Sequence, residues 1–309
     1  MEKENTLSSA DKIKRIFTHE PKTVLVRLKG IVRELSVKNF LQSAEQPVVR
    51  NLADCCLFSV LSYAPDSRTI EIKEEGSKVP VEKRIELPKS WEEITNLPDI
   101  VTDYRNETGR KTYNGLSYRV FKNINSKTII VAFRGSTSEK GDWLSNARWV
   151  TRINPFHDDH YDVIQDKIDS LLEAACKEID ANNNDEIRVI ATGHSLGGGL
   201  ATMAAYASDK INEVVAINSS PITGFYGVPV GERSRNKKDL LIARIFEHGE
   251  VLAYLRLPLR LFYPLSKEHP TILEARFNFG IRKSTITEHS LPSFANAIWN
   301  AANGSSIYS

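Results

Sequence analysis

The motif with the clearest chemical meaning is Gly-His-Ser-Leu-Gly at residues 193–197. It lies between an apolar segment typical of a strand, residues 187–191, and a run of small residues typical of a helix, residues 195–208. In such a strand–turn–helix setting the turn is sharp, and the flanking glycines leave room for it. The helix N-terminus below presents unpaired N–H groups toward developing negative charge. The motif therefore predicts that Ser195 is the nucleophile of a hydrolase.

A serine hydroxyl is a poor nucleophile by itself, so it needs a histidine base and a carboxylate that orients the base. In hydrolases with this turn the chain order is serine, acid, histidine. His289 follows the last predicted strand, residues 272–279, where a loop can reach back over the sheet. We therefore predict His289 as the base. The alternatives are His248, which could support the site or be merely exposed, and His269, which reads as a surface-loop residue.

The acid is expected just after the predicted strand at residues 240–246. Glu250 is the first choice, with Glu247 and then Asp239 as alternatives. The alternative for each glutamate is a solvated carboxylate on a loop.

The oxyanion of a tetrahedral intermediate needs two hydrogen-bond donors. One is expected from the backbone N–H of Leu196, the residue after the nucleophile. The other is expected from the loop after the apolar strand at residues 128–133, where Ser136 offers both an N–H and a hydroxyl. The alternative for Ser136 is an ordinary Ser/Thr turn before a helix.

The elements that must position these residues alternate between strand and helix. Strands are predicted at residues 118–122, 128–133, 187–191, 213–217, 240–246 and 272–279, and helices at 51–63, 163–179, 195–208 and 290–302. This alternation predicts an α/β fold with a mostly parallel central sheet and helices on both faces. Residues 66–112 are charged and rich in loops, with short strands expected at 69–72 and 84–87.

Composition excludes several classes of protein. The 309 residues carry a net charge of +2, which argues against a protein that coats nucleic acid. No apolar run is long enough for a transmembrane helix, and the first residues do not read as a secretory signal. Cys55, Cys56 and Cys176 read as reduced core thiols. We therefore expect a cytoplasmic protein, with secretion by a signal-independent route as the open alternative.

Several motifs together resemble one known family. VAFRGSTS at 131–138, DWLSN at 142–146, ATGHSLGGGLA at 191–201 and the late His289 look like the class 3, or fungal-type, lipases of the α/β-hydrolase superfamily. This combination is far more specific than G-x-S-x-G alone. The specific resemblance covers residues 127–220, and a looser one extends from about residue 50 to about residue 295.

The resemblance implies a single α/β-hydrolase domain over residues 1–309. It would comprise an N-terminal extension at 1–50, a lipase-like core at 51–300 and a lid at about 139–160. By resemblance, the lid contains Trp143, Trp149 and Phe156.

The resemblance also implies roles for single residues. Ser195 becomes the nucleophile, His289 the base, and Ser136 and Leu196 the oxyanion donors. Glu250 stands where the family has an aspartate. The family implies esters of long acyl chains and no metal cofactor, and a metal site at residues 157–160 is not favoured.

The expected partner is a lipid or other ester substrate, with transient contact to a membrane surface and no nucleic acid. Triglyceride, phospholipid and smaller esters stay open as substrates. A phospholipase toxin delivered by a bacterial secretion system is one alternative function. A non-lipid esterase or a non-catalytic binding protein on the same fold is another.

Overall fold

A computed structural model describes most of the chain. The described residues are 21–43, 50–72, 80–102, 116–135, 160–179, 186–219, 223–248, 269–279 and 291–308.

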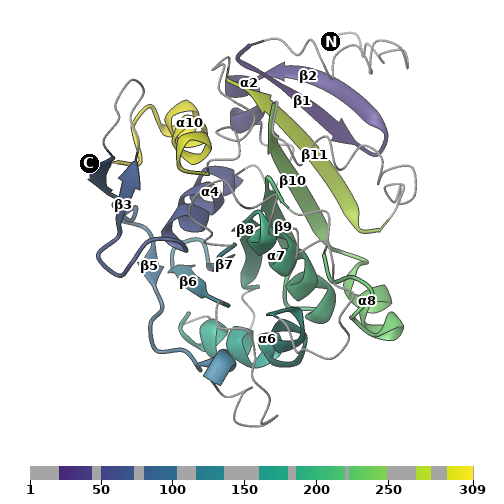
Figure 1. Cartoon of the computed structure of the whole chain (residues 1–309). Helices are drawn as coiled ribbons and strands as arrows, with labels where there is room; N and C mark the ends of the chain where they lie inside the picture. Colours follow the sequence, from purple (N-terminus) through teal and green to yellow (C-terminus); the bar gives the residue numbers. More distant parts are fainter. Residues whose placement is uncertain are drawn as a thin grey trace.

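A nine-stranded sheet forms the centre of the described structure, in the order β2-β1-β11-β10-β9-β8-β7-β6-β5 (Figure 1). Its strands are β1 (Thr23–Leu28), β2 (Ile31–Ser36), β5 (Glu92–Glu93), β6 (Tyr118–Asn123), β7 (Thr128–Phe133), β8 (Arg188–His194), β9 (Glu213–Ile217), β10 (Leu241–Glu247) and β11 (Thr271–Asn278). Strands β7 to β11 are mutually parallel, and antiparallel strands extend the sheet on both sides. The predicted mostly parallel α/β sheet is confirmed.

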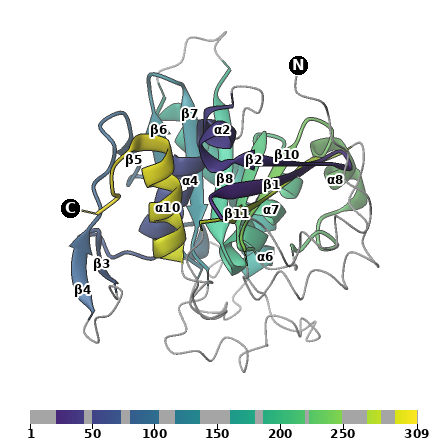
Figure 2. The same cartoon turned by 90° about the horizontal axis from the view of Figure 1, so that it is seen from above.

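Helices cover both faces of this sheet (Figures 1 and 2). One face packs against α2 (Val37–Gln42), α4 (Leu52–Leu61) and α10 (Leu291–Asn303), and the other against α6 (His160–Lys177) and α7 (Leu196–Ala207). Every residue of β7, TIIVAF, is buried because both of its faces are covered. A short helix, α8 (Val230–Asn236), precedes β10.

The predicted strand at residues 84–87 is wrong. A separate two-stranded sheet instead pairs β3 (Thr69–Ile72) with β4 (Val81–Arg84). The apolar signal after β4 has another cause, because Ile85 is fully buried in the core and forms an isolated bridge with Tyr308.

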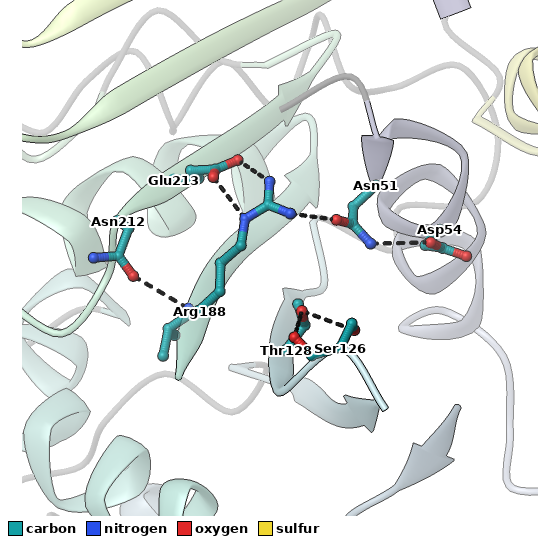
Figure 3. A network of polar contacts seen from close by, with 8 residues as sticks. Asn51, Asp54, Ser126, Thr128, Arg188, Asn212 and Glu213 are labelled. Atoms are coloured by element: carbon teal, nitrogen blue, oxygen red, sulfur yellow. Dashed lines mark hydrogen bonds and ion pairs between the residues drawn. The ribbon is translucent and has the colours of Figure 1, made fainter. Parts of the chain in front are cut away.

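A polar network joins elements at the edge of the sheet where β8 and β9 begin (Figure 3). Arg188 donates through Nε and Nη2 to the two carboxylate oxygens of Glu213, at 2.7 and 2.6 Å. Its Nη1 donates to Oδ1 of Asn51 at 2.6 Å, and Asn51 Nδ2 donates to Asp54 at 3.2 Å. Burial raises the pKa of Asp54 to about 6. The network ties α4 to the starts of β8 and β9, at the opposite end of β8 from Ser195.

Two features of the sequence have plain structural counterparts. Cys55, Cys56 and Cys176 are free thiols, the first two buried in α4 and the third half-buried in α6. Among the described residues, none of the helices has the length and apolar character that crossing a membrane requires.

Candidate active site

Ser195 alone makes the turn between β8 and α7. The strand ends at His194, the helix begins at Leu196, and Ser195 adopts φ 57° and ψ −122°. A non-glycine residue with positive φ is uncommon and strained, and such strain collects at functional sites. This is the backbone form expected of a nucleophile turn, so it supports the role predicted for Ser195.

Hydrogen bonds on both sides hold this turn. The Ser195 N–H donates to the carbonyl of Ile217 at the end of β9, at 3.1 Å. The Ser195 carbonyl accepts from the Gly198 N–H, also at 3.1 Å, in the first turn of α7. The neighbouring strand and the helix therefore both fix the backbone that carries the hydroxyl.

The start of α7 lies directly against the end of β7. A Cβ atom on Gly197 would lie 2.2 Å from the carbonyl oxygen of Phe133, the last residue of β7. Only glycine permits this approach, because a backbone oxygen cannot move aside. The close contact brings the N-terminus of α7, with the Leu196 N–H, next to the strand that leads toward Ser136. The 12-residue helix adds the positive end of its dipole at this point.

The end of β10 brings one of the candidate acids to the same edge of the sheet. Glu247 is the last residue of β10 and is buried, with 9% of its surface exposed. Asp239 precedes β10 and so lies at the opposite edge, which excludes it as the triad acid. Glu250 lies outside the described residues.

Two of the candidate histidines lie, like the acids, at opposite ends of the parallel strands. His269 precedes β11 and lies at the edge away from Ser195, so it cannot serve as the base. His248 follows Glu247 at the correct edge and is half-buried. Burial and then the charge of Arg276 lower the pKa of His248, so its imidazole is neutral near pH 7. His289 lies outside the described residues.

Asn218 is a residue at this edge that the sequence analysis missed. It follows β9, is fully buried and has a φ of 40°. Its N–H donates to the carbonyl of Ile245 at 2.8 Å, and its Oδ1 accepts from the Glu247 N–H at 3.0 Å. It thereby fixes the end of β10, where Glu247 lies. An asparagine directly after an apolar strand was the available signal, since asparagine tolerates positive φ.

Ser136, Trp143, Trp149 and Phe156 lie outside the described residues, as Glu250 and His289 do. The described part of the site is thus a strained serine at a helix N-terminus, with a buried carboxylate at the end of a strand two places along the sheet. This arrangement can present a hydroxyl nucleophile and a backbone donor for an oxyanion.

Comparison with known proteins shows what this part of the chain resembles. Residues 77–221 match the family model described as "Phospholipase-like: Tle-like phospholipase domain". This segment is therefore similar to a phospholipase-like family. It contains Ser195, Leu196 and Ser136 and ends before Glu250 and His289.

A curated relative agrees with the phospholipase-like segment. An extracellular phospholipase A1 from Serratia liquefaciens is 35% identical over 101 residues, which are 33% of this chain and 27% of the relative. The chain thus matches about a quarter of that relative's length. These two matches confirm the expected likeness to enzymes of the lipase and phospholipase type.

The solved structures similar to the chain include fungal lipases. Lip2 lipase from Yarrowia lipolytica has 15% identity and a TM-score of 0.39, covering 70% of this chain and 75% of that one. Rhizomucor miehei lipase in its propeptide complex has 16% identity and a TM-score of 0.39, covering 72% and 67%. A triacylglycerol lipase from Penicillium expansum has 17% identity and a TM-score of 0.34, covering 63% and 69%.

Proposed function

We propose that this chain is a serine hydrolase that cleaves carboxylic esters of lipids, with phospholipids as the substrate class. The observation that carries the proposal is the strained Ser195 between β8 and α7, with its backbone held on both sides. A phospholipase-like family match over the same segment supports the lipid substrate. The curated relative, an extracellular phospholipase A1, supports the phospholipid choice over a triglyceride.

The proposed mechanism forms an acyl-enzyme. The Ser195 hydroxyl attacks the ester carbonyl while His289 removes its proton and then gives it to the leaving alcohol. Glu250 orients His289 and stabilises it when it is protonated; Glu247 is the alternative acid. The N–H groups of Leu196 and Ser136 stabilise the oxyanion, and water then releases the fatty acid. A lid at about 139–160 would cover the acyl chain.

Lipid mass spectrometry on mixed vesicles of phospholipid and triacylglycerol tests this proposal. Wild-type protein should release a fatty acid and the matching lysophospholipid, and Ser195→Ala should release neither. The Ser195→Ala protein must show the same circular dichroism spectrum and melting temperature as the wild type. A short p-nitrophenyl ester, assayed beside the vesicles, reports the chemistry without the lipid surface.

The outcomes separate the alternatives. Release from triacylglycerol alone would replace the proposal by a neutral-lipid lipase. Cleavage of the p-nitrophenyl ester without lipid release would indicate a non-lipid esterase. Turnover retained in Ser195→Ala would refute the nucleophile. No turnover of any ester, together with no labelling by a fluorophosphonate probe, would indicate a non-catalytic binding protein.

A second candidate shares the chemistry and differs in biology: a phospholipase exported to act on membranes outside the producing cell. The name of the curated relative, an extracellular enzyme, favours it. Directing the chain to the periplasm of a test bacterium should be toxic, and Ser195→Ala should abolish the toxicity. Equal growth of cells carrying wild type and Ser195→Ala would argue against this candidate.

A further inference from the structure

The hydroxyl of Tyr63 lies between two backbone segments that flank the site. It accepts a hydrogen bond from the N–H of Gly135, just beyond the end of β7, at 3.0 Å. It also lies 3.2 Å from Nδ1 of His194 and 3.4 Å from the His194 carbonyl oxygen. Because it accepts from Gly135, its proton is available to His194. One hydroxyl therefore links the segment before Ser136 to the residue before Ser195.

This junction leaves no room for a side chain at position 135. A Cβ atom on Gly135 would lie 2.3 Å from the Tyr63 hydroxyl oxygen and 2.5 Å from the His194 carbonyl oxygen. The backbone of Gly135 thus sits directly against both groups. Glycine at position 135 therefore lets this segment lie against both the tyrosine oxygen and the end of β8.

The segment that carries Tyr63 is itself firmly held. Arg119 on β6 donates through Nη1 to the carbonyl of Leu61, the last residue of α4, at 3.1 Å. Inside the same helix, the Ser59 hydroxyl lies 3.2 Å from the Thr192 hydroxyl on β8. Thr192 in turn donates to the carbonyl of Val215 on β9, at 2.8 Å. These hydrogen bonds therefore fix the position of Tyr63 relative to the central strands of the sheet.

Tyr63 acts as a neutral group. Burial raises its pKa well above the ordinary value of a phenol, and the hydrogen bond from Gly135 and the charge of Arg134 oppose this only in part. The hydroxyl keeps its proton at any pH at which the protein would work. Its contribution is geometric, since it neither gains nor loses a proton at those pH values.

We infer that Tyr63 is a positioning residue of the oxyanion hole. The inference rests on the proposed function, in which Leu196 and Ser136 supply the two donors. Each donor lies one or two residues beyond a group bound by the Tyr63 hydroxyl: Gly135 on one side and His194 on the other. The hydroxyl holds the backbone of Gly135 next to that of His194, and through them it acts on the two donors of the proposed oxyanion hole. Transition-state stabilisation depends on the spacing of these donors, because an oxyanion must lie within hydrogen-bond distance of both.

The test removes this hydroxyl alone. Tyr63→Phe should lower kcat for a p-nitrophenyl ester by about 10- to 100-fold, the loss expected when a catalytic donor is displaced by a fraction of an ångström to an ångström. KM should be nearly unchanged, because the ground-state ester does not need the oxyanion geometry. Tyr118→Phe is the matched control. Tyr118 lies on β6, the strand paired with β7, and its hydroxyl donates to the Pro98 carbonyl at 3.0 Å. Removing this hydroxyl should leave kcat at the wild-type value.

A second measurement separates positioning from simple destabilisation. A short alkylboronic acid forms a tetrahedral adduct with a reactive serine, so its inhibition constant reports the oxyanion geometry in the folded protein. For Tyr63→Phe this constant should rise by about the factor by which kcat falls. Both are measured well below the melting temperature of the variant.

The outcomes are distinct. A lower melting temperature with unchanged kcat, or a change confined to KM, would overturn the inference and leave the proposed function intact. Wild-type protein without serine-dependent turnover would defeat both. If Tyr63→Phe does not fold, His194→Leu and His194→Asn replace it. Asparagine keeps a polar atom near the position of Nδ1, so it should lose less kcat than leucine, and equal losses would contradict the inference.

Discussion

Ser195 and Gly197 have backbone positions that the surrounding structure enforces. A strained φ such as that of Ser195 costs on the order of 1–3 kcal/mol, and hydrogen bonds from β9 and α7 offset it. Gly197 enables the turn by letting α7 start against the carbonyl of Phe133. The strain and the close approach together hold the serine above the ends of the strands.

Gly197→Ala tests this close approach. The new methyl group would overlap the Phe133 carbonyl, so the variant should lose about 1–3 kcal/mol of unfolding free energy and most of its p-nitrophenyl ester turnover. Urea unfolding and kcat measure the two effects. Gly231→Ala in α8 is the control, because nothing lies within 4 Å of its added Cβ, and it should be neutral or slightly stabilising. Equal behaviour of the two variants would show that α7 does not contact β7 this closely.

Single polar residues mark the limit of what the sequence could reveal at this scale. Ser195 was predictable because its neighbours form a motif with a mechanical meaning. Tyr63 and Asn218 belong to no motif. Tyr63 reaches the site only after α4 has packed against β8, and Asn218 only after β9 has paired with β8 and β10. Their roles depend on contacts between segments distant in the chain, which no local pattern encodes.

At the scale of elements, α4 runs from one end of the parallel strands to the other. Its carboxyl end leads to Tyr63 beside the candidate active site, and its start carries Asn51 and Asp54 in the network around Arg188. The pKa of the Asp54 carboxyl is raised from 3.8 to about 6, with burial as the main cause. Asp54 therefore destabilises the fold when it is ionised.

The sign of this effect gives a pH-dependent prediction. Because the folded-state pKa of Asp54 exceeds its unfolded value, stability that is present below about pH 4 is lost as the pH rises through 6. The asparagine of Asp54→Asn does not titrate. The unfolding free energy of this variant, relative to that of the wild type, should therefore rise by about 2–3 kcal/mol between pH 4 and pH 7. Urea unfolding across this range measures the gain. A difference between Asp54→Asn and the wild type that stays constant with pH would refute the prediction.

The predicted strands of the central sheet and the predicted helices that cover it were confirmed because their hydrophobic patterns are strong. Runs such as TIIVAF are buried on both faces, and α6 has one apolar stripe. The sequence analysis missed β1 and β2, whose apolar runs are short and interrupted by charged residues. The same cause explains the error at β4, a charged strand whose apolar neighbour Ile85 belongs to the core instead.

At the scale of the whole molecule, the N-terminal strands complete the sheet. All six residues of β1 pair with β11, so β1 covers an edge of the parallel sheet that would otherwise present unpaired backbone groups. The helix α2 follows and places Phe40 edge-on to Phe277 of β11, with ring centroids 5.5 Å apart. These contacts favour one folding unit that includes the segment assigned as an N-terminal extension.

The single-domain proposal can be tested through Phe40. Phe40→Ala removes a side chain that is only 2% exposed and packs on the central sheet, so it should cost about 3–5 kcal/mol. Ile31→Ala, at a 40% exposed position on β2, should cost less than about 1 kcal/mol. In one cooperative unit, the urea midpoint of Phe40→Ala falls equally by tryptophan fluorescence and by far-ultraviolet circular dichroism. Two separate midpoints would instead mean that the N-terminal strands unfold on their own, leaving the rest of the sheet and the Ser195 turn in place.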